Sequence, residues 1–435
     1  MTRMTIVGGG IVGASQAFEA ARAGYKVRLL EKNHEVAREA SFGHAGILCP
    51  TLADAYFYSG LSKGHDEKLS GRVELFRKLH IRKAGENALR AVAGLVHSSN
   101  KILLEEQVKD PKFLDAVGDN ETNINDLFTI NGALLVLGSE DEAKAEEAGQ
   151  IKVINEAGSS LADSTGVAPF SIKKINRQSA IEKEPCLANM DGHSAFYWHE
   201  PGLSTRVALL TKIYCDAVSK MGGEIKTGVD IKSFGTVGSK VTKLIAGDTR
   251  EFDVDRNEVI VLATGASTEL LDRVGINAPI LPFKGTVITV QVDEAHSKGL
   301  PTRPICFGPF TTKPIGVDKD NGRHLLKLAG GTDSITYDTT PDSAAVRDLE
   351  KLATEALLKS IPFSVVQRWA GLRPVSADGY AMLGRTRLFE NVSLNVGHCS
   401  TGLSQAAQCA QWIVKEVAES GVNKIPEVYH PDRFI

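Results

Sequence analysis

The chain has 435 residues, of which 42% are hydrophobic and 24% are charged, and its formal net charge is −3 at pH 7. This length exceeds what one hydrophobic core usually supports, so two domains, or one domain with a large insertion, are expected. The balanced charge excludes a general electrostatic attraction to nucleic acids, so no nucleic-acid partner is expected.

The compartment is predicted from three absences in the sequence. No run of about 18 apolar residues occurs, so no membrane-spanning helix is predicted. The first strand pattern begins by Met4, which leaves no room for the apolar core of a signal peptide. The six cysteines are scattered without close pairs, which favours neither a disulfide framework nor a metal site. We therefore expect a cytoplasmic protein without a bound metal, and the oligomeric state stays open.

The first elements in chain order predict a βαβ unit. Residues 4–7 form an apolar run of strand length, residues 11–24 have apolar residues at helical spacing and end at a glycine, and residues 25–32 resume a strand pattern. Strand, glycine turn, helix and strand together fit into about thirty residues, which is the length of such a unit.

The glycine turn after the first strand has the spacing of a dinucleotide-binding site. Gly8 permits the tight turn, Gly10 lets the backbone approach a pyrophosphate, and Gly13 lets the helix pack against the strand. Ile11 and Val12 begin the helix, whose N–H groups and partial positive charge would face the phosphates. The turn therefore predicts a dinucleotide.

Glu31 supplies the other end of this predicted site. It lies at the end of the second strand, where a carboxylate accepts hydrogen bonds from an adenosine ribose and repels a 2′-phosphate. Lys32 follows it directly. The acid at this distance from the glycine turn favours an unphosphorylated ribose.

The middle of the chain is predicted to form a layer of helices and strands separate from the βαβ unit, and later strands are predicted to lead back to the nucleotide site. Residues 65–110 are expected to be helical, and residues 128–158 to form a hairpin that turns at Asn131 and Gly132, then a charged helix. Strand patterns recur up to residue 262, at 282–292 and at 323–335.

Two further glycine-rich strand ends favour FAD over NAD. Thr264 and Gly265 end one buried strand, and Gly397 and Gly402 precede the last helix. The start of that helix would face an anionic group, which in a flavin enzyme is the N1 and C2=O region of the ring. A nicotinamide-linked dehydrogenase, which needs no such return of the chain, is the alternative.

The sequence resembles the D-amino-acid oxidase superfamily of FAD-dependent enzymes, most closely its bacterial D-amino acid dehydrogenase branch. The resemblance runs over nearly the full length and rests on IVGGGIVG with Glu31, EASFGHAGILCP, VIVLATGAS, WAGLRPVSADGYAMLGR and LNVGHCSTGLSQAAQCA. It implies an α/β fold in which a Rossmann-like FAD-binding domain is interleaved with an α+β substrate-binding domain built on an antiparallel sheet. We expect residues 1–60, 196–268 and 362–435 in the FAD-binding domain, and residues 61–195 and 269–361 in the substrate-binding domain.

The resemblance also implies which residues bind FAD. They are Gly8, Gly10, Ile11, Val12, Gly13, Glu31, Lys32, Ser41, His44, Ala45, Gly46, Val229, Thr264, Gly265, Arg373, Gly397, His398, Thr401, Gly402 and Leu403. Some relatives attach the flavin through a cysteine at the position of Gly371, so noncovalent FAD is expected here.

Arg373 is the main candidate for substrate binding. A planar guanidinium can hold a carboxylate through two parallel hydrogen bonds, and family members use the matching arginine in this way. Tyr380 and His199 are further candidates for catalytic residues at the substrate. Related amine oxidases place an oxygen-activating lysine on a strand comparable to that of Lys327, but the alternating polarity around it predicts a solvated face.

The resemblance implies FAD-dependent oxidative deamination of a D-amino acid to a 2-oxo acid and ammonia. The electrons would pass to a quinone or another carrier, or to oxygen in an oxidase. A quinone acceptor would fit peripheral association with the cytoplasmic face of the inner membrane. Two alternatives remain. The substrate is a secondary amine such as D-proline, hydroxyproline or sarcosine, or else glycine, or the protein binds flavin without catalysing a reaction.

Overall fold

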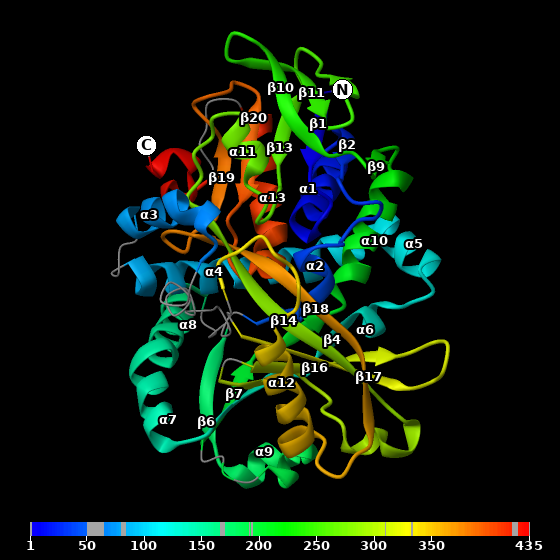
Figure 1. The fold of residues 1–435 in the computed structure, drawn as a ribbon, viewed down its shortest axis with the longest axis vertical. Coiled ribbons are helices and arrows are strands. Elements are labelled where there is room, and N and C mark those ends of the chain that lie inside the picture. The colour runs from blue at the N-terminus through cyan, green and yellow to red at the C-terminus, as the bar shows by residue number, and fades with distance from the viewer. Residues whose placement is uncertain are drawn as a thin grey trace.

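The computed structural model describes residues 2–49, 65–79, 84–165, 170–190, 192, 195–308, 310–331, 334–419 and 425–434. The chain folds around two large sheets, one in the upper and one in the lower half of Figure 1, and the first and last elements lie together in the upper half. The expected mixed α/β class is confirmed. Within the described ranges, no helix is both long and apolar enough to cross a lipid bilayer.

The upper sheet is the predicted nucleotide-binding sheet. Its strands run in the order β19 (Met382–Arg385), β20 (Val392–Val396), β13 (Val259–Leu262), β1 (Arg3–Val7), β2 (Lys26–Leu30) and β9 (Glu224–Lys226). All neighbours are parallel except β19 and β20. Val7 lies opposite Leu30 on one side and Leu262 on the other, so the carboxyl ends of three strands meet at one edge.

Helices cover one face of this sheet. They are α1 (Ile11–Arg22), α10 (Val207–Lys220) and α13 (Gly402–Ala418), whose buried side chains share a core with Met4 and Ile6. The opposite face packs against α11 (Glu269–Arg273) and a small sheet of β10 (Ile231–Val237), β11 (Lys240–Ala246) and β12 (Glu251–Asp253). The sheet is therefore buried on both faces, as apolar parallel strands require.

The lower sheet has eight strands. Their order is β18 (Phe363–Ser376), β14 (Ile280–Val292), β17 (His324–Gly330), β16 (Phe310–Val317), β15 (Ile305–Phe307), β5 (Ala133–Leu137), β7 (Ala195–Glu200) and β6 (Ser171–Ile175). The pairs are antiparallel except β15 with β5. One face packs on α9 (Arg177–Lys183) and α12 (Ser343–Leu352) through residues such as Ile288 and Leu326. On the opposite face, strands β5, β6 and β7 pack against α4 (Ala84–Glu105) and α8 (Lys152–Thr165).

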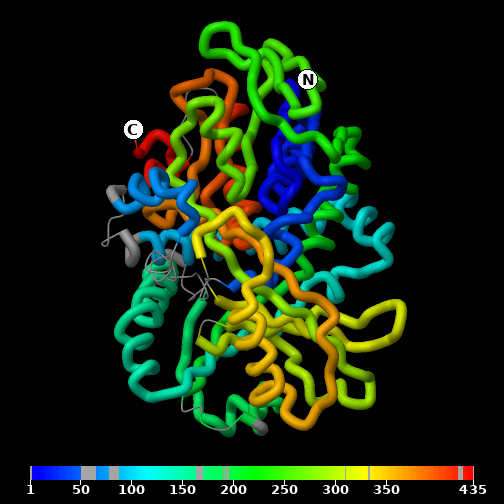
Figure 2. Tube along the Cα trace, viewed as in Figure 1, coloured from blue at the N-terminus to red at the C-terminus, as the bar shows by residue number. Residues whose placement is uncertain are grey.

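The other elements connect and cover the two sheets (Figure 2). The helices are α2 (Ala40–Gly43), α3 (Ser70–Leu79), α4 (Ala84–Glu105), α5 (Pro111–Asp119), α6 (Ile124–Leu127), α7 (Glu140–Glu146) and α8 (Lys152–Thr165). A third sheet consists of β3 (Ile47–Leu48), β8 (Leu203–Thr205) and β4 (Phe128–Ile130).

The predicted hairpin at Asn131 and Gly132 is wrong. The strands on either side of this turn, β4 and β5, do not pair with each other but enter two different sheets. A Cβ at Gly132 would lie 2.0 Å from the ring of Trp198, so the turn passes directly over this side chain. Close packing therefore accounts for this glycine.

The proposed domain division stays a prediction. Strands β7 and β18 belong to the eight-stranded sheet, although they begin the segments 196–268 and 362–435 that were assigned to FAD binding. The expected boundary at residue 60 lies outside the described residues.

Candidate functional site

The glycine turn between β1 and α1 is built on close backbone contacts. Gly8 has a φ of +116°, and a Cβ there would lie 2.3 Å from the carbonyl oxygen of Ala263. A Cβ at Gly13 would lie 1.9 Å from the carbonyl oxygen of Gly8. Neither position accepts a side chain, whereas the nearest atom to a Cβ at Gly10 is the Ser41 hydroxyl at 3.3 Å. Gly8 and Gly13 therefore shape the turn, and Gly10 is the position that leaves space for a ligand.

The carboxylate of Glu31 is held in a fixed orientation beside this turn. Its Oε2 accepts a hydrogen bond from the Gly9 N–H at 2.6 Å, and its Oε1 accepts from the backbone and side chain of Asn33 at 2.8 and 2.7 Å. Glu31 is buried and lines a large cavity. The oriented carboxylate suits the acceptor role predicted for a ribose. Asn33 was not a sequence candidate, although an amide two residues after the acid is a local signal.

A cavity of about 790 Å³ joins the two halves of the molecule. It begins at the glycine turn and extends along the face of the eight-stranded sheet that lies opposite to α9 and α12, from Arg373 on β18 to Ile172 on β6. The cavity brings together most of the predicted cofactor residues, namely Gly8, Gly10, Ile11, Val12, Glu31, Lys32, Ser41, His44, Ala45, Val229, Thr264, Gly265, Arg373, His398, Thr401, Gly402 and Leu403.

Three predicted cofactor residues lie behind the cavity wall instead of in it. They are Gly13, Gly46 and Gly397. A Cβ at Gly46 would lie 2.0 Å from the carbonyl oxygen of Thr205, and one at Gly397 would lie 3.3 Å from Met382. These glycines permit close packing that shapes the loops in front of them.

Buried polar atoms at the cavity are suited to a polar cofactor. His398 Nε2, Thr264 Oγ1 and Ser400 Oγ are buried and have no hydrogen-bond partner within the described part of the chain. All three residues line the cavity. Unpaired buried polar groups are costly, so a bound molecule with complementary polar atoms would stabilise them. FAD carries such atoms along its whole length, and the residues present fit this cofactor.

His44 connects two of the predicted flavin loops. Its Nδ1 accepts from the Gly46 N–H at 2.8 Å, and its Nε2 lies 3.1 Å from the carbonyl oxygen of Ser400, so the neutral ring carries its proton on Nε2. Burial, followed by the nearby cations that include Arg373, lowers the pKa of His44 to about 4, against an opposing effect of the Ser400 carbonyl. His44 is therefore neutral at neutral pH.

The expectation that Lys327 lies on a solvated face is wrong. Its Nζ donates to the carbonyl oxygens of Phe42 and His44 at 3.2 and 3.4 Å, beneath the loop that carries His44. Burial lowers the pKa of Lys327 to about 8. Alternation along β17 correctly places Lys327 and its alternate neighbours on one face of the strand. The prediction failed because the loop that carries His44 covers this face.

Lys313 is a buried cation that the sequence reasoning missed. It lies opposite Lys327 on the neighbouring strand β16 and donates to the carbonyl oxygen of Thr205. Burial, and then repulsion from Lys327, lowers the pKa of Lys313 to about 7. Lys327 thus holds the His44 loop on the sheet, and Lys313 holds Thr205, whose N–H donates to the Gly46 carbonyl oxygen.

The guanidinium of Arg373 lies on the cavity face of the eight-stranded sheet. Nη1 donates to the carbonyl oxygens of Gly331 and Lys284 at 3.1 and 3.5 Å. A Cβ at Gly285 would lie 2.5 Å from Nη1, so the guanidinium rests directly on the backbone of β14. This arrangement presents a planar cation to the cavity, beside the His44 loop.

Trp369 forms the neighbouring part of the wall. A Cβ at Gly371 would lie 2.0 Å from its ring, and a Cβ at Gly43 would lie 1.9 Å from it. The indole therefore covers position 371, and this crowding supports the expectation that FAD is not attached there. Neither Trp369 nor Gly285 was a sequence candidate. Trp369 lies four residues before Arg373 on β18, so alternation along this strand already places both side chains on one face. Gly285 is brought to Arg373 only by the register of β14 and β18.

The two remaining catalytic candidates lie in different places. His199 lines the far part of the cavity, where burial lowers its pKa to about 3. Tyr380 does not line the cavity but packs edge-on against Tyr429 in the core of the upper half, with ring centroids 5.5 Å apart. This placement argues against the predicted role of Tyr380 at the substrate. The sequence interval from Arg373 to Tyr380 includes a turn, which directs the ring away from the cavity.

Within the described residues, no group of three or more His, Cys, Asp or Glu side chains is arranged to hold a metal ion.

Comparisons with known proteins identify the family of this chain and several similar folds. The sequence profile of the FAD dependent oxidoreductase (DAO) family matches residues 3–416. Glycine oxidase from Bacillus cereus is 21% identical, with 97% of this chain and 96% of that chain covered at a TM-score of 0.68. L-proline dehydrogenase from P. horikoshii is 18% identical, with 100% and 97% covered at a TM-score of 0.70. Iminodiacetate oxidase from Chelativorans sp. BNC1 is 17% identical, with 99% of each chain covered at a TM-score of 0.68. Because the profile spans nearly the whole sequence, the chain belongs to the FAD dependent oxidoreductase (DAO) family, and its cofactor is FAD.

Proposed function

We propose that the protein is a D-amino acid dehydrogenase that oxidises the carbon between an amine and a carboxylate. The observation that carries this proposal is the Arg373 guanidinium on the floor of the cavity, beside the loop of His44. A guanidinium held against backbone carbonyls on one side can bind a carboxylate with its outward edge.

The proposed reaction requires orientation more than acid or base catalysis. FAD, when bound, supplies a two-electron acceptor for the hydride that leaves Cα. Arg373 would hold the carboxylate so that Cα–H faces the flavin, which reduces the entropic part of the barrier. The amine enters as the free base and loses one proton, which gives an imine that water hydrolyses to a 2-oxo acid and ammonia.

The cavity histidines fit a role in positioning. Burial lowers the pKa of His398 and His199 to about 3, and that of His44 to about 4. All three are neutral at neutral pH, and none adds a positive charge that would repel the cationic form of an amine substrate. Neutral imidazoles can hold the flavin loops or the amine by hydrogen bonds.

The choice of a D-amino acid rests on the resemblance of residues 369–385 to the D-amino acid dehydrogenase branch. A secondary amine such as D-proline, hydroxyproline or sarcosine, or else glycine, is the second candidate, and the similar folds of glycine oxidase and L-proline dehydrogenase favour it. We propose a quinone as the acceptor, reached from the cytoplasmic face of a membrane. The position of Lys327 beneath the His44 loop favours oxygen as the alternative acceptor, because related amine oxidases use a lysine on a comparable strand.

The test is anaerobic reduction of the bound flavin by a panel of amines. The panel contains D-amino acids, D-proline, hydroxyproline, sarcosine and glycine, and turnover is then measured with an artificial dye and with oxygen. Bleaching by D-amino acids and turnover with the dye are expected. Flavin that no amine bleaches would indicate a non-catalytic binding protein, and a colourless protein that binds NAD would contradict the proposal.

Variants of Arg373 test the carboxylate contact. Arg373→Ala should lower kcat/KM for amino acids by on the order of a hundredfold, because a charge-assisted bidentate contact contributes about 3 kcal/mol. Arg373→Lys keeps the charge but not the fork, so it should recover part of this loss. Amino acid amides lack the carboxylate, so the substitutions should lower kcat/KM for these amides much less. Equal losses for acids and amides would refute the contact.

A further inference from the structure

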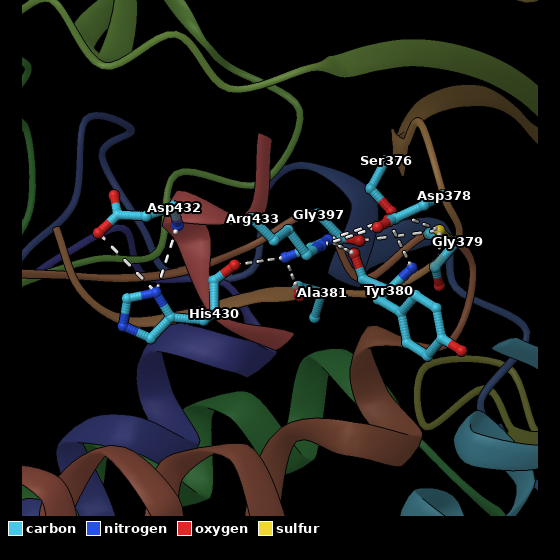
Figure 3. Close-up of polar contacts among 10 residues, drawn as sticks. Ser376, Asp378, Gly379, Tyr380, Ala381, Gly397, His430, Asp432 and Arg433 are labelled. Atoms are coloured by element: carbon cyan, nitrogen blue, oxygen red, sulfur yellow. Dashed lines mark hydrogen bonds and ion pairs between the residues drawn. The ribbon is translucent and has the colours of Figure 1, made fainter. Parts of the chain in front are cut away.

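The carboxyl-terminal segment of the chain packs against the turn that follows β18. Within this segment, residues Pro431–Phe434 form a short 3₁₀ helix that carries Arg433. The Arg433 Nε donates to Asp378 Oδ2 at 2.7 Å, and its Nη2 donates to Asp378 Oδ1 at 2.9 Å (Figure 3). The two side chains are only 12% and 13% exposed. A bidentate pair with this little solvent contact has a defined geometry.

The same guanidinium also binds backbone carbonyls on both sides of the contact. Nη2 donates to Tyr380 at 2.8 Å, and Nη1 donates to Ala381 at 3.2 Å and to His430 at 3.0 Å (Figure 3). One side chain thus ties the end of the chain to the turn 376–380. We call the pair of Asp378 and Arg433 the C-terminal clamp.

The clamped turn lies directly behind a loop that lines the cavity. Cys399 Sγ lies 3.7 Å from Ser376 Oγ and 3.8 Å from the carbonyl oxygen of Gly379, and the Cys399 N–H donates to Pro374 at 2.9 Å. Val375 and His398 form a bridge between the two segments. A displacement of the clamped turn would therefore move the loop 397–401.

The clamped turn is also continuous with the strand that carries Arg373. Only two residues, Pro374 and Val375, separate Arg373 from Ser376, the first residue of the turn, and both take part in the contacts just described. The clamp is thus connected to both parts of the candidate site, the loop at His398 and the guanidinium of Arg373.

We propose that Arg433 is a positioning residue for the flavin and for the substrate-binding arginine. This inference rests on the proposed placement of the flavin ring against the loop 397–401. Without Arg433, the partly buried Asp378 carboxylate would keep the hydrogen bond from the Tyr380 N–H but lose its charged partner, and the turn would rearrange to solvate the carboxylate. A shift of about 1 Å in a reacting geometry is enough to slow a reaction severely.

The test compares three variants of the FAD-loaded protein. Arg433→Ala should shift the visible absorption bands and the reduction potential of the flavin and slow its reduction by on the order of tenfold. Arg433→Lys keeps the charge and should recover part of each change. Arg323→Ala is the matched control, because Arg323 also pairs with an aspartate, Asp293, but the two side chains are 46% and 55% exposed, so water can solvate the remaining carboxylate and the variant should behave like the wild type.

A purely structural role gives a different result. Arg433→Ala would then lower the melting temperature but leave the absorption bands, the potential and the reduction rate unchanged, which would overturn the inference. If Arg433→Ala does not fold, Asp378→Asn provides the same readouts, and unchanged flavin properties in that variant would overturn it equally. The absorption bands and the potential need no substrate, so the clamp can be tested even if no amine reduces the wild-type flavin and the proposed function fails.

Discussion

Gly285 on β14 lies beneath the guanidinium of Arg373 on β18, and a Cβ at Gly285 would approach the Arg373 Cζ to 2.6 Å. The two residues are brought together by the pairing of β14 with β18, in which Gly285 lies opposite Gly371 and Arg373 lies opposite Phe283. The bare backbone at this point lets the guanidinium lie flat against the sheet.

Gly285→Ala is therefore expected to displace Arg373 without removing it. The methyl group pushes the guanidinium away from Lys284 and Gly331, so the carboxylate contact is misplaced and kcat/KM for amino acids falls by about tenfold to a hundredfold. Steady-state kinetics with amino acids and their amides measure this, and the amides should be nearly unaffected. The control is Gly71→Ala, where a Cβ meets no atom of the described residues within 4 Å. Unchanged kinetics in Gly285→Ala would contradict the arrangement.

Gly10→Ala is expected to reduce FAD binding while the fold is kept. Among the described residues, a Cβ at Gly10 meets only the Ser41 hydroxyl, at 3.3 Å, but it would occupy the space that the pyrophosphate approaches. Equilibrium binding of FAD to the apoprotein measures the loss. Gly13→Ala is the matched variant, because its Cβ would lie 1.9 Å from the Gly8 carbonyl oxygen and should lower the melting temperature of the apoprotein itself. Full flavin affinity in Gly10→Ala would show that the phosphates bind elsewhere.

His398→Gln is expected to make the protein less sensitive to acid. Burial lowers the pKa of His398 to about 3 from 6.5, so between these values the unfolded chain binds one more proton than the folded chain. Stability is therefore lost as the pH falls from about 6.5 towards 3, with a slope of about 1.4 kcal/mol per pH unit for each such histidine. Urea titrations of the apoprotein between pH 6 and 4 should show a shallower slope in the variant. The exposed His34 serves as the control through His34→Gln. An unchanged slope in His398→Gln would contradict a buried neutral imidazole.

Lys313→Met is expected to change the stability in the alkaline range. The pKa of Lys313 is lowered to about 7 from 10.5, so between these values the unfolded chain binds the additional proton and the stability of the wild type rises with pH. The variant lacks this rise, so its stability relative to the wild type should decrease steadily from pH 7 to pH 10. Denaturant titrations measure the difference, and Lys144→Met, at a side chain that is 73% exposed, should show no such trend. A constant difference across this range would mean that folding does not lower the pKa of Lys313.

The local sequence was sufficient to predict the nucleotide turn and the acid that follows it. Gly8, Gly13 and Glu31 lie in one βαβ unit, where residue spacing and backbone geometry nearly fix the structure. The later glycine turns at Gly265 and Gly397 could also be recognised as strand ends. Their approach to one cavity followed from the resemblance, because nothing in the spacing between distant segments specifies which edges of a sheet meet.

Only the tertiary structure decided which face of each substrate-side element lines the cavity. Alternation along β17 divides its residues between two faces, and a lysine on such a strand predicts a face exposed to solvent. The sequence does not show that the loop of His44 covers the face that carries Lys327. Likewise, the turn after Arg373 directs Tyr380 into the core, and the pairing of β14 with β18 brings Gly285 beneath the guanidinium. These contacts depend on strand register and on packing between segments that are far apart in the chain, and such long-range contacts leave no periodic signal in the sequence.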